Sequence, residues 1–226
     1  TTEIYTLSLH DALPICPFLG GKGNSIIDMV QMGLRVPPAF ILSYPLLAAM
    51  AGAPNADHIR AGIIAHLHEL ELRTGSLLGR GERPLLLSVR SGALTSMPGM
   101  MSTIMNVGLV PRVRAALSKR YGADFVDTLY LRFLENCESA LGGADKNAGQ
   151  STDQGAARRL RHGKTAALES SLTASLGSSF LTDAEKQLFA CIGLVYNSRT
   201  SKTVDLYSKT LASREAVETA ATIQQV

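Results

Sequence analysis

Tryptophan is absent from the sequence, and aromatic residues make up only 5% of it, although 46% of its 226 residues are hydrophobic. The core must therefore be built mainly from aliphatic side chains, which favours helices and short strands over an all-β sandwich. So large a hydrophobic fraction also excludes a disordered tail, and the length suits one large domain or two small ones.

Charged residues and cysteines are also scarce. Charged residues make up 18% of the chain, and 22 basic against 19 acidic residues leave a net charge of +3. The basic residues are scattered, so the charge pattern does not require a nucleic-acid partner. The three cysteines, Cys16, Cys137 and Cys191, are far apart and form no C-x-x-C pair, which fits a reducing cytosol.

One of the two longest stretches without charge, residues 36–56, is interrupted by four prolines, at positions 37, 38, 45 and 54. Proline breaks a helix and removes backbone donors that lipid cannot replace. We therefore expect a buried segment of a cytoplasmic protein and no association with a membrane.

Residues 1–15, TTEIYTLSLHDALPI, lack an early positive charge: Lys22 is the first lysine or arginine, and Glu3 and Asp11 precede it. A secretory signal peptide needs such a charge, so none is expected. All fifteen residues match the conceptual translation of a common sequencing-adapter oligonucleotide. We therefore expect a segment that is not native and leave it out of the fold prediction; an ordinary N-terminal strand is the alternative.

Hydrophobic spacing predicts a mixture of helices and strands, an α/β (α+β) fold. A glycine turn at residues 20–23 leads into a helix that Gly33 ends, and a capping box at residues 182–185 begins another. Phe125, Leu129 and Phe133 are expected to share one side of a helix over residues 123–141, and 91–103 and 142–155 are expected to be loops. Further helices are expected at residues 45–50, at 57–72 and from 111, and strands at 40–42, 85–89, 104–107 and 219–226.

Residues 20–23 read Gly-Gly-Lys-Gly at the predicted start of a helix. Glycines let backbone N–H groups approach an anion, the helix adds its positive end, and Lys22 supplies a mobile charge. The segment satisfies neither G-x-x-x-x-G-K-[ST] nor G-x-G-x-x-G. It therefore indicates either a phosphate-binding turn or a plain tight turn with a solvated lysine.

The stretch S-V-R-S-G-A-L-T-S-M-P-G-M-M, residues 88–101, gives the strongest signal for a binding site. Arg90 directly follows a predicted buried strand, and small hydroxyl and glycine residues come after it. Such a strand exit can offer a bidentate donor and backbone amides to a triphosphate; the alternative is an arginine that fixes the loop by a salt bridge. The methionines around Pro98 and Gly99 indicate a lid over a ligand or, as methionines usually do, core packing.

Together the motifs resemble those of the pyruvate, phosphate dikinase family, in its N-terminal nucleotide-binding domain of the ATP-grasp type. They are F-L-G-G-K-G-N-S-I-I-D-M at residues 18–29, G-L-R-V-P-P-A-F at 33–40, and residues 88–108, which are the most specific. The resemblance implies part of an ATP-grasp-type domain at residues 16–110, a mainly helical subdomain at 111–215, and the start of a truncated second half at 216–226. Water dikinases (phosphoenolpyruvate synthases) share the first two motifs but not the S-M-P-G-M-M run, and they are the alternative enzyme.

The resemblance implies a domain that binds Mg-ATP and phosphorylates a histidine on a separate domain, which carries the phosphoryl group to pyruvate. ATP, pyruvate and phosphate would become AMP, phosphoenolpyruvate and diphosphate. By position, Lys22 and Arg90 would be the catalytic residues that hold the phosphates. The other nucleotide-binding residues would be Ser91, Gly92, Ser96, Met97, Gly99, Met100, Met101 and Thr103. Leu94 and Ser102 stand where the family has a frequent arginine and the usual aspartate.

We assign no metal ligand within the chain. The resemblance places the Mg²⁺ ligands, the phosphohistidine and the pyruvate site beyond Val226, so we expect a fragment that is inactive alone; the full-length enzyme could be a homodimer. His66 and His68 are two apart on a predicted helix and face different directions, which argues against metal binding, and His58 and His162 are expected at the surface. A stand-alone nucleotide-binding or partner-binding module is the non-enzymatic alternative.

Overall fold

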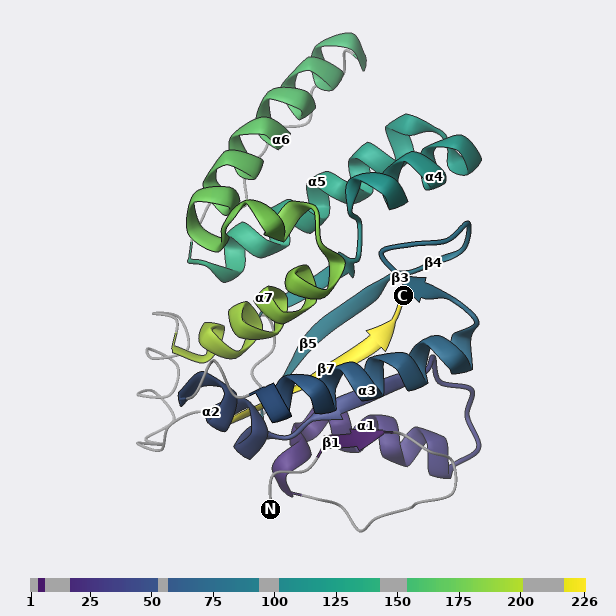
Figure 1. Cartoon of the computed structure of the whole chain (residues 1–226), viewed down its shortest axis with the longest axis vertical. Helices are drawn as coiled ribbons and strands as arrows, with labels where there is room; N and C mark the ends of the chain where they lie inside the picture. Colours follow the sequence, from purple (N-terminus) through teal and green to yellow (C-terminus); the bar gives the residue numbers. More distant parts are fainter. Residues whose placement is uncertain (1–3, 7–16, 53–56, 94–101, 143–153, 201–217) are drawn as a thin grey trace.

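The computed structural model describes residues 4–6, 17–52, 57–93, 102–142, 154–200 and 218–226. Helices pack on both faces of one antiparallel sheet (Figure 1). The expected α/β (α+β) fold class is confirmed.

The sheet has five strands in the order β1-β2-β7-β5-β6, and each strand is antiparallel to its neighbours. The strand from the C-terminal end of the chain, β7, therefore lies at the centre. A separate parallel pair is formed by β3 and β4. The bounds are β1 (Ile4–Thr6), β2 (Ala39–Leu42), β3 (Leu77–Leu78), β4 (Pro84–Leu85), β5 (Leu87–Ala93), β6 (Thr103–Val107) and β7 (Thr219–Gln225).

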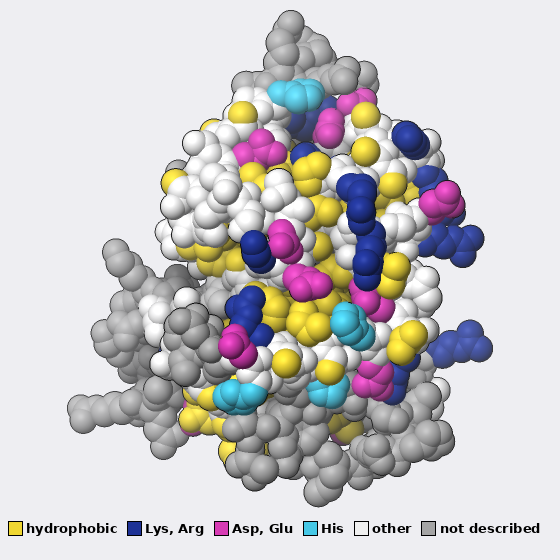
Figure 2. Space-filling view, in the orientation of Figure 1, with side chains coloured by type: hydrophobic (Ala, Val, Ile, Leu, Met, Phe, Trp, Pro, Cys, Tyr) yellow, Lys and Arg dark blue, Asp and Glu magenta, His cyan; other side chains and the backbone are white. Residues whose placement is uncertain are grey.

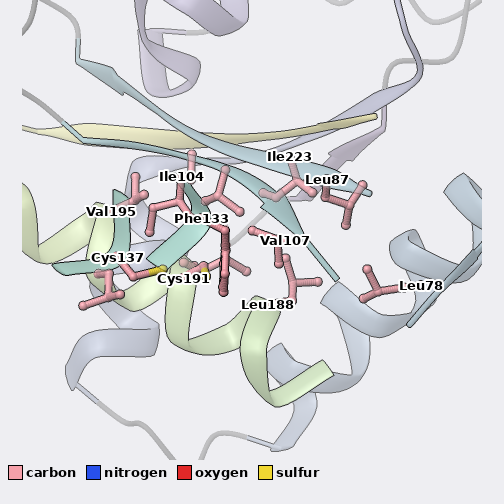
Figure 3. Packing of buried hydrophobic residues seen from close by; sticks show 14 of the residues in the cluster. Leu78, Leu87, Ile104, Val107, Phe133, Cys137, Leu188, Cys191, Val195 and Ile223 are labelled. Carbon is pink, nitrogen blue, oxygen red and sulfur yellow. The ribbon is translucent and has the colours of Figure 1, made fainter. Parts of the chain in front are cut away.

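One helix, α1 (Gly20–Gln31), packs on one face of the sheet, where Leu19, Ile41 and Ala220 form a small buried cluster. On the other face, a large cluster joins the strands to all the remaining α-helices. Figure 3 shows part of this cluster, in which Val107 of β6 lies near Phe133 and Leu188. The remaining elements are α2 (Tyr44–Gly52), α3 (Asp57–Thr74), α4 (Pro111–Tyr121), α5 (Ala123–Ala140), α6 (Gln154–Leu176) and α7 (Ala184–Asn197), with short 3₁₀ turns η1 (Pro17–Leu19), η2 (Ser178–Leu181) and η3 (Ser198–Thr200).

Several expectations about single elements were wrong. The strand expected at residues 85–89 is divided between β4 and β5, and β5 continues to Ala93, so residues 91–93 are strand rather than loop. Phe125 is 53% exposed because Val126 and Tyr130, with Phe133, occupy the buried side of α5. The N-cap of α7 is Asp183, whereas the expected capping box would begin at Thr182. The sequence pattern of residues 154–176 did not predict the helix α6.

The expected division of the chain into parts remains a prediction. The described residues of 111–200 are mainly helical, yet their buried side chains belong to the same cluster as those of the sheet. Residues 219–225 complete this sheet between β2 and β5. Residues 4–6 pair with residues 40–42 as an edge strand, the arrangement that was the alternative to an adapter-derived segment.

Among the described residues, no helix is both long enough and apolar enough to cross a membrane.

Candidate functional site

The glycine-rich motif and the strand motif lie in direct contact. Gly20 is the first residue of α1 and has a φ of +70°, and a Cβ atom at this position would overlap the carbonyl oxygen of Gly92 in β5. A Cβ atom on Gly92 would in turn lie 3.8 Å from the Cβ atom of Lys22. The absence of a side chain at position 20 therefore lets the first turn of α1 rest against β5. Residues 20–23 are this first turn, not the turn before the helix that we had expected.

Alternation along β5 puts Arg90 on the face that α1 covers. Leu87 and Val89 belong to the large cluster on the opposite face of the sheet. Because successive side chains of a strand point to opposite faces, Ser88, Arg90 and Gly92 share the α1 face. Arg90 therefore lies within the strand and beside the helix, not at the strand exit where the sequence had placed it.

The neighbours of Arg90 in the sheet carry hydroxyl groups. Its partner across β7 is Thr222, and its partner across β6 is Thr103, one of the expected nucleotide-binding residues. The Thr222 Oγ1 atom is buried and has no hydrogen-bond partner among the described residues. Ser91 is buried too, but strand alternation turns its side chain to the face opposite Arg90, away from where a covering loop over the site would need it.

Lys22 lies close enough to Arg90 for the two cations to interact. The pKa of Lys22 is lowered, first by partial burial of the ammonium group and then by the positive charge of Arg90, although the side chain as a whole is exposed. Among the described residues, neither cation forms an ion pair with a carboxylate. Two positive charges beside the first turn of a helix, with no carboxylate partner in the described part of the chain, form an arrangement suited to an anion.

Gln224 of β7 connects Arg90 to the Val-Pro-Pro motif. Arg90 Nη1 donates to Gln224 Oε1 at 3.3 Å, and Gln224 Nε2 donates to the carbonyl oxygen of Pro37 at 3.2 Å. Next to it, the backbone N–H of Gln225 donates to Pro38 O at 3.0 Å. All three sequence motifs thus meet at the α1 face of β5 and β7. The sequence pattern of residues 219–226 predicts a strand and does not single out Gln224.

Several expected site residues, namely Ser96, Met97, Gly99, Met100 and Met101, lie outside the described residues, as does Leu94. Ser102, which stands at the position of the family's aspartate, donates its backbone N–H to Ser198 Oγ at 3.3 Å. The structure therefore places Lys22, Arg90, Gly92 and Thr103 together and turns Ser91 away.

The described residues contain no group of three or more His, Cys, Asp and Glu side chains that could hold a metal ion. His66 packs its ring on Phe40 with 6.2 Å between the ring centroids, and its Nδ1 lies 3.6 Å from Glu69 Oε2. Through these contacts the His66 side chain packs α3 against β2.

A hollow of about 540 Å³ lies away from this face, between α3, β3 and the first turns of α4 and α7. Its lining mixes acidic and basic side chains: Glu71 accepts the backbone N–H of Leu78 at 2.7 Å, and Arg112 donates to Gly79 O at 3.4 Å. Figure 2 likewise shows acidic and basic side chains intermixed with hydrophobic ones on the face in view. None of the lining residues belongs to the motifs, so the Lys22 and Arg90 face remains the candidate site.

Comparison with known proteins identifies relatives of one kind. Over 200 residues, 80% of this chain, it is 34% identical to the chloroplastic pyruvate, phosphate dikinase of Mesembryanthemum crystallinum. This chain is homologous to part of the pyruvate, phosphate dikinases. Its identity is 33% over 207 residues to chloroplastic dikinase 1 of Zea mays and 32% over 195 residues to the dikinase of Rhizobium meliloti (strain 1021).

The aligned part is a small piece of each dikinase: it covers 20% of the M. crystallinum protein, 21% of the Z. mays protein and 22% of the R. meliloti protein. No family model matches the chain. The resemblance that the motifs indicated is nevertheless confirmed, and the relatives belong to a kinase and phosphotransferase family.

Proposed function

We propose that this chain forms part of the ATP-binding site of a pyruvate, phosphate dikinase and holds the nucleotide phosphates through Lys22 and Arg90. The observation that supports this most directly is the contact between Gly20 and Gly92, because it brings the two cations together without a carboxylate from the described residues. Like charges held side by side cost free energy in the empty site, and a bound polyanion would offset that cost.

The two cations suit different tasks. Arg90 offers a planar fork that can donate to two phosphate oxygens, whereas Lys22 is a mobile point charge at the positive end of α1. Backbone N–H groups in the first turn of α1 have no partner within the helix and can donate to an anion. In a phosphoryl transfer, these donors would position the phosphates and stabilise the charge that develops on them.

When bound, Mg²⁺ would neutralise charge on the nucleotide phosphates. The described residues offer no carboxylate cluster at the site, so its ligands remain expected in the part of the dikinases beyond Val226. Phosphohistidine transfer to pyruvate, the overall reaction to AMP, phosphoenolpyruvate and diphosphate, a homodimeric full-length enzyme and a cytoplasmic location likewise remain proposals from the resemblance. A water dikinase fragment and a non-catalytic nucleotide-binding or partner-binding module are the alternatives.

Calorimetric titration of the chain with ATP tests the proposal. Arg90→Lys should lower ATP affinity about tenfold or more, since hydrogen bonds to charged groups contribute about 1.5–3 kcal/mol and 1.4 kcal/mol is tenfold. Lys22→Met should also weaken binding. Lys119→Met, an exposed lysine of α4, is the matched control and should bind ATP as the wild-type chain does.

Thermal unfolding at pH 7 separates lost binding from lost folding. The folded state lowers the pKa of Lys22, so charged Lys22 is held less favourably in the folded than in the unfolded chain. Lys22→Met should therefore keep or slightly raise the melting temperature while it weakens ATP binding. No detectable ATP binding by the wild-type chain, or equal losses in Lys22→Met and Lys119→Met, would contradict the proposal.

A further inference from the structure

We propose that Gln224 is a positioning residue for Arg90: its side-chain amide fixes where the guanidinium group presents its remaining donors to nucleotide phosphates. The inference rests on the proposed function. It concerns a residue of the central strand that the motifs did not include, and it follows from two hydrogen bonds at one side chain.

The two hydrogen bonds agree on a single orientation of the amide. A guanidinium group can only donate and a backbone carbonyl oxygen can only accept. Gln224 Oε1 must therefore face Arg90 Nη1, and Gln224 Nε2 must face Pro37 O, as the structure has them. The Pro37 carbonyl oxygen thus fixes the orientation of the Gln224 amide, and the amide fixes the position of one edge of the Arg90 guanidinium group.

The surroundings of Gln224 keep this side chain in place. Gln224 is 8% exposed. Its backbone carbonyl oxygen accepts a hydrogen bond at 3.3 Å from the hydroxyl group of Ser88, which lies in the same strand as Arg90. Ser88 and Gln224 are also register partners across β5 and β7. An arginine side chain loses rotational freedom about several bonds when it binds a ligand. A partner that already holds the side chain in place therefore reduces the entropic cost of binding.

Gln224 also gives the Val-Pro-Pro motif a role in the site. Proline fixes the backbone of residues 37 and 38, and their carbonyl oxygens accept from the Gln224 side chain and the Gln225 backbone. The segment before β2 is thereby tied to the residue that holds Arg90. Gln224 thus makes one directed contact to Arg90 and one to the backbone of the segment that precedes β2.

The test uses the full chain and two variants of neighbouring glutamines. Gln224→Met keeps a similar side-chain length but removes both hydrogen bonds. Gln225→Met is the matched control, because its side chain points to the other face and its bond to Pro38 uses the backbone. For each protein, calorimetry gives the affinities for ATP and for adenosine, and ¹⁵N NMR gives the exchange rate of the Arg90 side-chain N–H hydrogens with water; Arg90→Lys assigns those signals.

We expect Gln224→Met to lower ATP affinity about five- to twentyfold, to change adenosine affinity less than twofold, and to speed exchange of the Arg90 hydrogens at least fivefold. Gln225→Met should change none of these. Gln224→Glu keeps an acceptor for Arg90 but neutralises its charge, so it should keep exchange slow and yet weaken ATP binding.

Unchanged Arg90 exchange in Gln224→Met would overturn the inference, and so would faster exchange with unchanged ATP affinity, or equal losses of ATP and adenosine affinity. Failure of the proposed function looks different: the wild-type chain would then bind no ATP at all. In that case the exchange rates would still decide whether Gln224 holds Arg90, and the nucleotide role of both residues would be overturned together.

Discussion

Gly20 determines how closely the first turn of α1 approaches the sheet. Its φ of +70° suits glycine, and the space where a side chain would stand is taken by the backbone of Gly92. Lys22 and Arg90 come together only because this approach is so close. The glycine-rich pattern indicated an anion site because glycines leave backbone N–H groups accessible. The structure adds a second reason for glycine at position 20: the backbones of the two motifs are in contact there.

Substituting Gly20, the first residue of α1, and Gly33, which follows the C-cap of α1, separates the cost of backbone conformation from the cost of the contact with β5. Gly33 has a similar φ of +75° with nothing within 4 Å of its missing Cβ atom. Gly33→Ala should therefore cost only about 1–2 kcal/mol, the penalty of the left-handed conformation. Gly20→Ala should cost about 1–3 kcal/mol more, because backbone atoms must also move apart. Urea unfolding measures both, and equal losses would mean that the contact with Gly92 contributes nothing.

Residues far apart in sequence limit what could be predicted at the site. The motifs pointed to Lys22 and Arg90, and the structure brings them together, although their binding role remains a prediction. Gln224 lies 134 positions from Arg90, and no local pattern distinguishes it from Gln225. The pairing of β5 with β7 alone gives it its role. Cross-strand register of this kind cannot be read from one sequence.

At the scale of single elements, the sequence predicts most of the helices and strands, but it misses α6 and ends β5 too early. The helix expected at residues 57–72 is α3, and its apolar residues at helical spacing, Ile59, Ile63, Leu67 and Leu70, are all buried. Residues 91–93 were expected to be loop because small residues without strand periodicity follow Arg90, but pairing with β7 extends β5 through them. In α5, the buried face lies one residue further along than expected, at Val126 rather than Phe125.

The start of α7 offers a test at this scale. Asp183 Oδ1 accepts the backbone N–H groups of Glu185 and Lys186, both at 3.1 Å, whereas Thr182 Oγ1 only reaches Ser179 O at 3.5 Å. Asp183→Ala should therefore lower the free energy of unfolding by about 1 kcal/mol, the usual value of an N-cap. Thr182→Ala should change it by less than about 0.5 kcal/mol. Chemical denaturation of both variants decides, and a larger loss at Thr182 would restore the capping box predicted from the sequence.

At the scale of the whole molecule, the last described strand holds the sheet together. β7 hydrogen-bonds to β2 on one side and β5 on the other, and Ala221 and Ile223 enter the same cluster as the helices of the second half of the chain. Composition and periodicity indicated both strands and helices. They did not show that a C-terminal strand would lie between two N-terminal ones, because strand order depends on long-range pairing.

The edge strand β1 and the central strand β7 lead to opposite expectations for truncation. β1 is a three-residue strand that pairs only with β2, and residues 1–15 are expected not to be native. Deleting Thr1–Ile15 should leave water to satisfy the exposed edge of β2 and should lower the melting temperature by less than about 4 °C, roughly 1 kcal/mol for a domain of this size. Deleting residues 219–226 removes the central strand and should abolish cooperative unfolding. Scanning calorimetry of both truncated chains tests this, and a drop of more than about 4 °C without residues 1–15 would show that β1 packs as an integral strand of the fold.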